Sequence, residues 1–591
     1  MYRAPVDEIS HTLKAVSGLY EAMESGLAGD LSEDLVDAIL EEAGKFASER
    51  IAPLHMIGDR HGTPLSDGVV TTPPGWADCY REWSEGGWNA LTGAEEFGGQ
   101  GLPMTMAMAA TEMWNAASMA FGLAPMLTMG AIEALEAHAS DPLKDTYLAK
   151  LISGEWTGTM NLTEPQAGSD LAALKASAQR RDDGSYRIFG QKIYITYGEH
   201  DMTDNIVHLV LARLPDAPAG TRGISLFLVP KFLVNEDGSL GARNDVFCNG
   251  IEHKLGIHAS PTCTMIFGDG KYGDEPGAIG WLIGEENRGL NCMFTMMNNA
   301  RLAVGVQGVG IAEASTQKAI AYANERTQGK AATFAGEGMA PIVHHPDVQR
   351  NLLTMKAMTQ AARAICYSCA HAIDMSHKGP QEERQFWTER ASLLTPIAKS
   401  FSTDMGSAVA SIGVQVHGGM GFVEETGAAI YMRDARIAQI YEGTNGIQGI
   451  DLVMRKLPLD DGGAVETYLK ELDAIIDQIA QSNQPSFGNT NACLQTAMDD
   501  LRAATETMMG FLAQRNHHAA LAAATPYQHM FGLVAGGTYL AKSALSDTSR
   551  QERVSLCRFF AENHVGEAAA LRERVEHGAA SLEAAATYLV A

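Results

Sequence analysis

Basic residues are scarce in this 591-residue chain. It has 44 Lys and Arg residues against 71 Asp and Glu residues, which gives a formal net charge of −27. Such a charge opposes binding to nucleic acids and to anionic membranes. A site for a phosphate-bearing ligand must then be locally basic or use helix N-termini. We therefore expect no nucleic-acid partner.

Cysteine is also sparse. The eight cysteines are scattered and suggest no disulfide framework, which is typical of a reducing compartment such as the cytoplasm. Cys366 and Cys369 form one CxxC pair inside a helical pattern, but no second pair and no histidine has metal-ligand spacing. We expect both cysteines to be structural and expect no metal site.

Long apolar runs are absent as well. The uncharged run at residues 116–132 is interrupted by Gly122 and Pro125. A transmembrane helix needs about 20 consecutive apolar residues, so this run predicts buried helices and no integral membrane segment. The first residues have no apolar core of the kind found in secretory signals. A cytoplasmic location is the expectation.

What the chain does contain is a change of pattern along its length. Its size and its 46% hydrophobic content indicate roughly two to four well-buried domains. Helical patterns fill residues 1–155 and return after residue 284. The strand-like runs between them are Tyr186–Gly190, Ile193–Thr196, Ile206–Arg213 and Ile224–Val229. A breaker-rich linker, residues 481–491, precedes an Ala-rich helical tail. The sequence therefore predicts an α+β protein with domains at residues 1–158, 159–284, 285–458 and 459–591.

One short segment carries a carboxylate in an unusual position. Residues 436–448 read RIAQIYEGTNGIQ, so Glu442 follows an apolar run and stands directly before a glycine. The pattern predicts a helix end, a tight turn and a new helix capped by Thr444 or Asn445. A carboxylate held against apolar surroundings, beside free backbone N–H groups, suits a general base that removes a proton from carbon. For the segment taken alone, a solvated turn glutamate is the alternative interpretation.

The wider sequence favours the catalytic interpretation, because five segments in order resemble the motifs of acyl-CoA dehydrogenases. Besides the Glu442 segment they are Met160–Asp170 (MNLTEPQAGSD), Gly190–Tyr197 (GQKIYITY), Lys254–Ser260 (KLGIHAS) and Gln415–Phe422 (QVHGGMGF). The resemblance implies the acyl-CoA dehydrogenase fold, with an N-terminal helical domain, a β-barrel-like middle domain and a C-terminal helical bundle. The tail beyond residue 459 resembles the extra helical domain of a long subgroup.

The resemblance also implies a reaction, the FAD-dependent oxidation of an acyl-CoA thioester between Cα and Cβ. Glu442 matches the family base for the α proton, and its own N–H and a ribityl hydroxyl of FAD would hold the thioester carbonyl. Flavin N5 would take the β hydride, because no side chain can. Burial should raise the pKa of Glu442 from about 4.3 toward about 6–7. Arg301 lies in a segment similar to the family's LDxxR and is expected beside the base, with Asn298 replacing the usual Asp.

Most other site residues are assigned to FAD by the same resemblance. The residues expected to bind FAD are Thr163, Ser169, Tyr194, Thr196, Arg326, Gln415, Gly418, Gly419 and Thr444. The residues expected to contact the substrate are Ser169, Asn298, Arg301 and Tyr441. Arg326 and the Gln415–Gly419 loop resemble groups that reach the FAD of a neighbouring subunit. Tyr194 stands where the family usually has Trp, and Tyr197 where it has Asn.

The implied partners are an acyl-CoA, an electron-transferring flavoprotein and further copies of the chain, in a dimer or a dimer of dimers. An acyl-CoA oxidase and a non-catalytic acyl-CoA-binding flavoprotein are alternatives on the same fold. The start, the length and the tail resemble bacterial dehydrogenases of 3-(methylthio)propanoyl-CoA in dimethylsulfoniopropionate breakdown, and also general long-type bacterial acyl-CoA dehydrogenases. We therefore expect 3-(methylthio)propanoyl-CoA as the substrate and 3-(methylthio)acryloyl-CoA as the product, with medium- or long-chain fatty acyl-CoA as the alternative substrate class.

Overall fold

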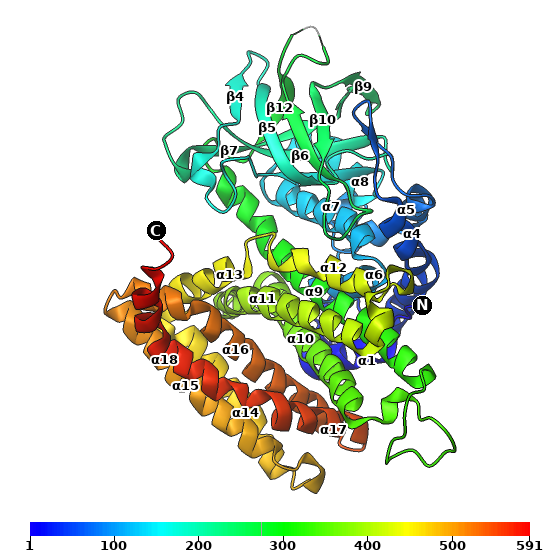
Figure 1. Ribbon diagram of the computed structural model, residues 1–591. Coiled ribbons are helices and arrows are strands. Elements are labelled where there is room, and N and C mark those ends of the chain that lie inside the picture. Colours follow the sequence, from blue (N-terminus) through cyan, green and yellow to red (C-terminus); the bar gives the residue numbers. More distant parts are fainter. Residues whose placement is uncertain (274, 591) are drawn as a thin grey trace. The chain divides into compact units, whose positions relative to one another are not determined.

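The computed structural model describes residues 1–273 and 275–590 (Figure 1). These residues form two compact units. One, termed the helical unit, comprises Met1–Gly44, Pro103–Ala116 and the chain from Arg301 to its described C-terminal end. The other, termed the β-containing unit, comprises Lys45–Leu102 and Ala117–Ala300. The long helix α9 (Gly289–Glu325) begins in the β-containing unit and continues through the helical unit.

The helical unit contains most of the helices of Figure 1. Besides α9 they are α1 (Val6–Thr12), α2 (Leu19–Glu24), α3 (Glu33–Phe46), α6 (Met104–Ala117), α10 (Pro346–Lys378), α11 (Arg384–His417), α12 (Ala428–Ala435), α13 (Asn445–Asp451), α14 (Gly463–Gln481), α15 (Thr490–Ala513), α16 (His517–Ser546), α17 (Gln551–Phe560) and α18 (Glu567–Ala586). Among residues 1–273 and 275–590, every helix falls short of the length and apolarity that a membrane crossing requires.

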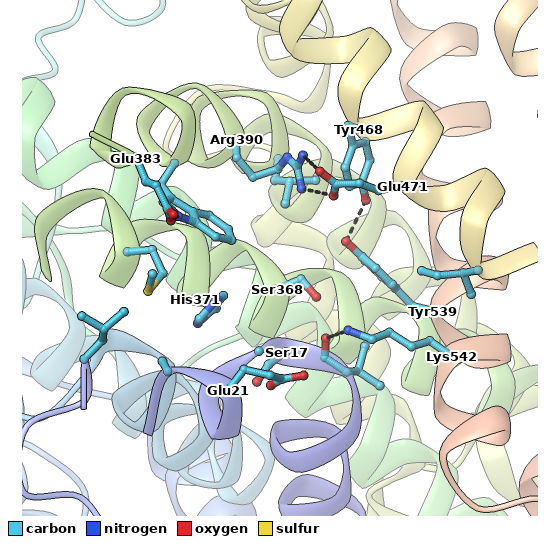
Figure 2. A pocket seen from close by; sticks show the side chains of 18 of the residues that line it. Ser17, Glu21, Ser368, His371, Glu383, Arg390, Tyr468, Glu471, Tyr539 and Lys542 are labelled. Carbon is cyan, nitrogen blue, oxygen red and sulfur yellow. Dashed lines mark hydrogen bonds and ion pairs between the residues drawn. The ribbon is translucent and has the colours of Figure 1, made fainter. Parts of the chain in front are cut away.

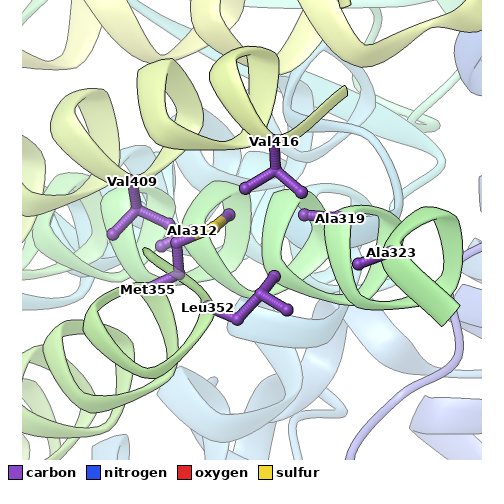
Figure 3. Close-up of a cluster of buried hydrophobic side chains, with 7 residues drawn as sticks. All are labelled: Ala312, Ala319, Ala323, Leu352, Met355, Val409 and Val416. Atoms are coloured by element: carbon purple, nitrogen blue, oxygen red, sulfur yellow. The ribbon is translucent and has the colours of Figure 1, made fainter. Parts of the chain in front are cut away.

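The core of the helical unit lies between α9, α10 and α11. Figure 3 shows a buried cluster with members from all three helices: Ala312, Ala319, Ala323, Leu352, Met355, Val409 and Val416. Close packing here depends on small residues. At Gly308 of α9, an added Cβ would lie 2.3 Å from the Ser402 carbonyl oxygen of α11. A larger residue at this position would therefore push the two helices apart.

The predicted structural role of the CxxC pair is consistent with where the two thiols lie. Cys366 Sγ is 3.3 Å from Ser402 Oγ, and Cys369 Sγ is 3.6 Å from Thr395 Oγ1. Both cysteines are buried, and burial raises the pKa of the Cys369 thiol to about 12. The two thiols thus pack between α10 and α11 as small, unreactive groups.

A buried ion cluster joins α6 to α9 and α10. Arg363 of α10 is fully buried and donates to Glu112 of α6 at 2.6 Å and to Glu313 of α9 at 2.9 Å. The Tyr367 hydroxyl also donates to Glu112, at 2.7 Å. Removing one charged partner would leave the other buried and uncompensated, which costs about 3–5 kcal/mol. The cluster therefore fixes how α6 lies against its two neighbours.

The C-terminal helices α14 to α18 extend the same unit. Helix α16 packs against α10, α11, α13, α15 and α18. Two contacts link it to the segments around Glu442. Gln528 Nε2 donates to the Pro396 carbonyl of α11 at 3.0 Å, and Ala524 packs against Gly449 of α13. The C-terminal helices are thus an integral part of the helical unit.

The β-containing unit combines helices with one large sheet. Its other helices are α4 (His55–His61), α5 (Trp76–Glu85), α7 (Met119–His138) and α8 (Asp141–Ile152). Its strands are β1 (Leu65–Ser66), β2 (Val69–Val70), β3 (Trp156–Asn161), β4 (Ser177–Arg180), β5 (Tyr186–Thr196), β6 (Asn205–Arg213), β7 (Ile224–Pro230), β8 (Phe232–Val234), β9 (Leu240–Arg243), β10 (Val246–Ile251), β11 (Thr262–Phe267) and β12 (Ala278–Ile283).

The large sheet has eight strands. Seven follow the order β10-β11-β5-β12-β7-β6-β3, and β4 pairs with both β5 and β6. Pairing is antiparallel except where β6 meets β3 and β4. The strands β6 and β7 are almost entirely buried, and their sequences are apolar without alternation. Such runs are typical of strands covered on both faces.

The helix–strand–helix order predicted from the sequence is present, and the linker at residues 481–491 separates α14 from α15. One strand prediction was wrong. The runs Tyr186–Gly190 and Ile193–Thr196 were expected to be separate strands, yet they form the single strand β5. Gly190, with φ of 135°, lies where an added Cβ would come within 3.0 Å of Ala176. The absence of a side chain at this position leaves room for Ala176, and the strand continues through it.

Candidate active site

Glu442 lies in a tight turn of the helical unit, between the short helix Arg436–Gln439 and α13. Its φ is 54° and that of Gly443 is 83°, so both residues are left-handed. For glutamate this conformation costs about 1–3 kcal/mol and persists only where the surroundings impose it. Thr444 begins the next helix as its N-cap, because its Oγ1 accepts a hydrogen bond from Ile447 N at 3.2 Å. The predicted turn and cap are confirmed.

A buried lysine of α11 holds this turn in place. Lys399 Nζ donates to the Gly443 carbonyl at 3.0 Å and to Asn445 Oδ1 at 2.8 Å. The Asn445 side-chain nitrogen makes further hydrogen bonds to α11. Gln448 Nε2 donates to the Glu442 carbonyl at 3.2 Å. All of these contacts use the backbone of the turn and its flanking residues, so the Glu442 carboxylate is left available.

The electrostatics of Glu442 suit a base. Within residues 1–273 and 275–590, its carboxylate has no hydrogen bond or ion pair. Burial raises its pKa, while the charges of Arg301 and Lys399 partly oppose that rise. Burial also lowers the pKa of Lys399 to about 7, against the opposing effect of Asp404 and Glu442. A carboxyl group with a raised pKa and free lone pairs can accept a proton near neutral pH.

Arg301 and Tyr441, both predicted from the sequence, belong to the same unit as Glu442. Arg301 is buried, and its Nη1 donates to Asp451 Oδ2 at 3.3 Å. Its Nε has no hydrogen-bond partner among the described residues. The Tyr441 hydroxyl donates to Gln307 of α9. The unpaired Arg301 Nε is thus a buried donor that a bound molecule can use.

In the β-containing unit, the Thr163–Ser169 loop is fixed by a buried ion pair that sequence reasoning did not identify. Lys192 Nζ of β5 donates to Glu164 Oε1 at 2.9 Å, and Glu164 also accepts from Lys175 N at 2.7 Å and Ala176 N at 3.0 Å. Burial favours a raised pKa for Glu164, but Lys192 and these hydrogen bonds outweigh it and lower the pKa. Burial lowers the pKa of Lys192 to about 8. The pair therefore stays ionised at neutral pH and holds the loop on the sheet.

The outer part of this loop keeps its ligand-binding groups available. Ile193 N donates to the Thr163 carbonyl at 2.9 Å, which uses the backbone alone. No hydrogen bond to the hydroxyl of Thr163 or Ser169 is found in the part of the chain that the structure describes. Gly168 has open space where a Cβ would lie. A ligand can therefore approach the backbone closely at this point.

The two departures from the family pattern near Thr196 have different consequences. Tyr194 and Tyr197 both have positive φ, 60° and 52°. Tyr194 is 60% exposed, so its ring is available to a ligand. Tyr197 is buried, accepts from Trp76 Nε1 at 3.2 Å and donates to the Ala120 carbonyl at 2.7 Å. Tyr197 thus anchors the end of β5 in the core, and Thr196 beside it is half-buried.

The predicted phosphate contacts lie at one end of the helical unit. They are Arg326, Gln415, Gly418 and Gly419, all exposed. Tyr322 of α9 stacks on His417 of α11 at 4.5 Å between ring centroids, so the C-terminal ends of these helices are adjacent. Neither Gly418 nor Gly419 has any atom near the place of a Cβ. Asn298 is also exposed but lies in the part of α9 that belongs to the β-containing unit.

Sequence reasoning missed Lys399, Glu164 and Lys192. A signal for Lys399 was present, because it is the one charged residue in residues 391–403 of a helical pattern. A lysine in such a run must find buried acceptors. Its partners could not be predicted, since Gly443 and Asn445 are more than 40 residues away in sequence.

Family models match most of the chain. They are Acyl-CoA dehydrogenase, N-terminal domain (residues 34–155), middle domain (159–269) and C-terminal domain (287–457), and Acetyl-CoA dehydrogenase C-terminal like (468–586). The 3-methylmercaptopropionyl-CoA dehydrogenase of Ruegeria pomeroyi is 42% identical over 590 residues, covering 97% of this chain and 98% of that protein. A butyryl-CoA dehydrogenase of Syntrophomonas wolfei is 38% identical over 474 residues, covering 78% and 76%.

The fold comparison agrees with the sequence comparison. The structure of an acyl-CoA dehydrogenase complexed with FAD from Bacillus anthracis superimposes with a TM-score of 0.73 at 22% identity, covering 93% of this chain and 89% of that chain. The predicted fold class, including the extra C-terminal helices, is confirmed. The matched domains and the nearly full-length relative show that the chain belongs to the acyl-CoA dehydrogenase family.

Proposed function

We propose that Glu442 is the catalytic base of this acyl-CoA dehydrogenase. The observation that carries the proposal is the strained turn, which Lys399 and Asn445 hold through its backbone while the carboxylate stays unpaired with a raised pKa. Glu442 Oε removes the α proton, and the Glu442 N–H donates to the thioester carbonyl, where negative charge develops. One such donor contributes about 3 kcal/mol to transition-state stabilisation. Arg301 is a nearby cation whose charge partly opposes the rise in the pKa of Glu442.

We propose FAD as the cofactor, because the residues present fit it. When bound, FAD supplies the hydride acceptor that protein side chains lack. In the β-containing unit, Gly168 leaves room beside the backbone, and Thr163, Thr196 and the exposed Tyr194 offer polar and aromatic contacts. Ser169 would contact FAD or the CoA phosphates. In the helical unit, Thr444 would add a contact, and the cradle at Gly418 and Gly419, with Gln415 and Arg326, suits a diphosphate.

The proposed substrate is 3-(methylthio)propanoyl-CoA, with contacts from Ser169, Asn298, Arg301 and Tyr441. Support comes from the near-complete alignment with the R. pomeroyi enzyme, whose name states that it acts on this thioester. The second relative is named for butyryl-CoA, also a short acyl chain. A thioether chain and an alkyl chain of equal length differ little in shape. A hydrophobic pocket separates such chains by only about 1–3 kcal/mol, so butanoyl- and pentanoyl-CoA should be accepted as well.

A panel of thioesters tests the substrate. We expect kcat/KM, measured with an artificial electron acceptor, to be highest for 3-(methylthio)propanoyl-CoA and to fall along the C4 to C16 acyl-CoA series. A strong preference for C12 or longer chains would replace this substrate with long-chain fatty acyl-CoA. Peroxide formed in proportion to substrate, without an added acceptor, would instead identify an oxidase.

We further propose a homo-oligomer that passes electrons to electron-transferring flavoprotein in the cytoplasm. The support is the exposed apolar surface after α11, where Phe422 is 89% and Met420 49% exposed. These residues lie next to the diphosphate cradle at Gly418 and Gly419, so one contact could serve both assembly and FAD binding. Light scattering should show a dimer or tetramer, and Phe422→Asp should lower FAD content together with assembly. A monomer with full FAD content would contradict the link.

A further inference from the structure

The helical unit contains a cavity of about 540 Å³, and none of its lining residues belongs to the Glu442 turn. Residues 16–27 form one side, α10 and α11 a second, and α14 with α16 a third. Figure 2 shows polar side chains from all three sides directed toward the space between them. Pockets that hold small molecules measure about 300–1,000 Å³. The cavity therefore has room for one small ligand.

Three hydrogen-bond donors line this cavity, Ser368 on α10 and Tyr539 and Lys542 on α16. Tyr468 Oη donates to Tyr539 Oη at 2.9 Å, which leaves the Tyr539 proton available. Ser368 Oγ is buried beside Tyr539, but no hydrogen bond of ordinary geometry to it is found among the described residues. Lys542 Nζ donates to the Val16 carbonyl at 2.9 Å and has no ion pair in the described part of the chain. Burial lowers the pKa of Lys542, and the charges of Glu21 and Glu471 only partly oppose that lowering.

The other charged groups around the cavity are already neutralised or solvated. Arg390 donates two hydrogen bonds to Glu471, both at 2.6 Å, and its guanidinium stacks on an aromatic ring. Burial and the nearby lysine lower the pKa of His371 to about 4, so it is neutral at pH 7. Glu21 and Glu383 are exposed to solvent. Glu21 and Glu471 attract Lys542 without forming an ion pair with it, so Lys542 is the cavity cation that can still pair directly with a ligand.

Much of the remaining lining is apolar, although Ser17 and Ser25 also belong to it. The apolar part includes Met375, Trp387, Leu394, Leu472 and Ile475. Trp387 packs edge-on against His371 at 5.3 Å between ring centroids, which fixes this wall. A ligand for this space therefore needs an apolar body beside its polar head.

We propose that this cavity binds a small carboxylate with an apolar tail, its head group on Lys542, Ser368 and Tyr539. An ionised carboxylate offers four acceptor sites and no donor, which matches three groups that each keep a proton for a ligand. Hydrogen bonds that involve two charged groups are short and strong. An amine would be repelled by Lys542, and an alcohol would leave its charge uncompensated. The proposal does not depend on the acyl-CoA reaction, because the cavity shares no residue with the proposed active site.

Calorimetric titration of the FAD-loaded full-length enzyme tests this. The probes are butanoate, octanoate and 3-phenylpropanoate, with octylamine and octanol as head-group controls. We expect at least one carboxylate to bind at one site per chain and the two controls to bind at least tenfold more weakly. Lys542→Met should weaken carboxylate binding at least tenfold. Lys470→Met, which removes a solvent-exposed lysine of α14, should leave it unchanged.

Two further variants keep the test decisive if Lys542→Met folds poorly. Ser368→Ala removes one donor and should weaken binding about two- to tenfold, and Lys542→Arg keeps the charge and should retain binding. A carboxylate that binds in the acyl-CoA pocket would be insensitive to all three substitutions, which overturns the proposal. So would equal binding of octanoate and octylamine, or no binding of any carboxylate to the wild-type enzyme.

Discussion

Glu442 lies in a turn of the helical unit, and Glu164 lies in the Thr163–Ser169 loop of the β-containing unit. The two glutamates differ in whether their carboxylate is paired. Each is largely shielded from water, and each lies in a loop that a buried lysine holds. Lys399 binds the backbone beside Glu442 and leaves its carboxylate unpaired, whereas Lys192 binds the carboxylate of Glu164 directly. The pKa of Glu442 is accordingly raised and that of Glu164 lowered.

The difference separates a reactive carboxylate from a structural one. Desolvation acts on both groups, so burial alone does not distinguish them. What distinguishes them is where the lysine donates its hydrogen bonds. A base needs fixed position and free lone pairs together, and only a clamp on the backbone provides both. Substitution of Glu442 should therefore lower the reaction rate with little loss of stability, whereas substitution of Glu164 should lower stability with little loss of rate.

The largest effect is expected for Glu442→Gln. The amide keeps the shape of the side chain but cannot accept the α proton, and loss of a general base costs about 10²–10⁴-fold in rate. FAD content, acyl-CoA binding and Tm should stay close to wild type. Stopped-flow bleaching of the flavin by substrate measures the step directly. Glu425→Gln, at an exposed glutamate of the same unit, is the matched control. Bleaching at the wild-type rate by the Glu442→Gln variant would remove Glu442 from its role.

Glu164→Gln should show the converse, a loss of stability with little change in the chemical step. Lys192 is fully buried, and removing its partner leaves an uncompensated charge at a cost of about 3–5 kcal/mol. Urea unfolding followed by fluorescence would measure the loss in the free energy of unfolding. The double variant Glu164→Leu with Lys192→Met removes both charges and should recover much of the stability. If the single variant is as stable as wild type, the pair does not hold the loop.

Only part of the contrast between Glu442 and Glu164 could be predicted from the sequence. The turn at Glu442 and its Thr444 cap followed from local residue types, since caps and turns are set by short-range hydrogen bonds. The domain order followed from the change in periodicity at Trp156. Whether a carboxylate is paired depends on distant residues, and Lys192 and Lys399 are 28 and 44 positions from the groups they bind. For the same reason Tyr197 could be seen as a departure from the family pattern, but its bonds to Trp76 and Ala120 could not.

An intermediate effect is expected for Lys399→Met. Hydrogen bonds from a charged donor contribute about 1.5–3 kcal/mol each, and loss of that order in the transition state lowers kcat about 10–100-fold. KM should change little, because Lys399 binds the turn and touches no predicted substrate contact. Steady-state kinetics at saturating FAD would separate the two parameters, with Lys470→Met as the solvent-exposed control. An unchanged kcat would mean that the turn keeps its strained conformation without the lysine.

The smallest effect concerns how stability depends on pH, and here the two glutamates should differ in sign. The folded pKa of Glu442 is raised, so its contribution to stability is complete below the unfolded pKa of about 4.3 and is lost as pH rises through the folded pKa. The amide of the Glu442→Gln variant cannot ionise and avoids this loss, so the Tm of that variant relative to wild type should increase with pH.

The folded pKa of Glu164 is lowered, so its contribution to stability is present above the unfolded pKa and is lost as pH falls through the folded pKa. The deficit of Glu164→Gln should therefore shrink toward acid pH. Thermal unfolding of both variants and of Glu425→Gln in one buffer series from about pH 3 to about 8.5 would measure these slopes. Parallel slopes for the two glutamates would show that their carboxylates sit in equivalent environments, and the distinction drawn between them would then be wrong.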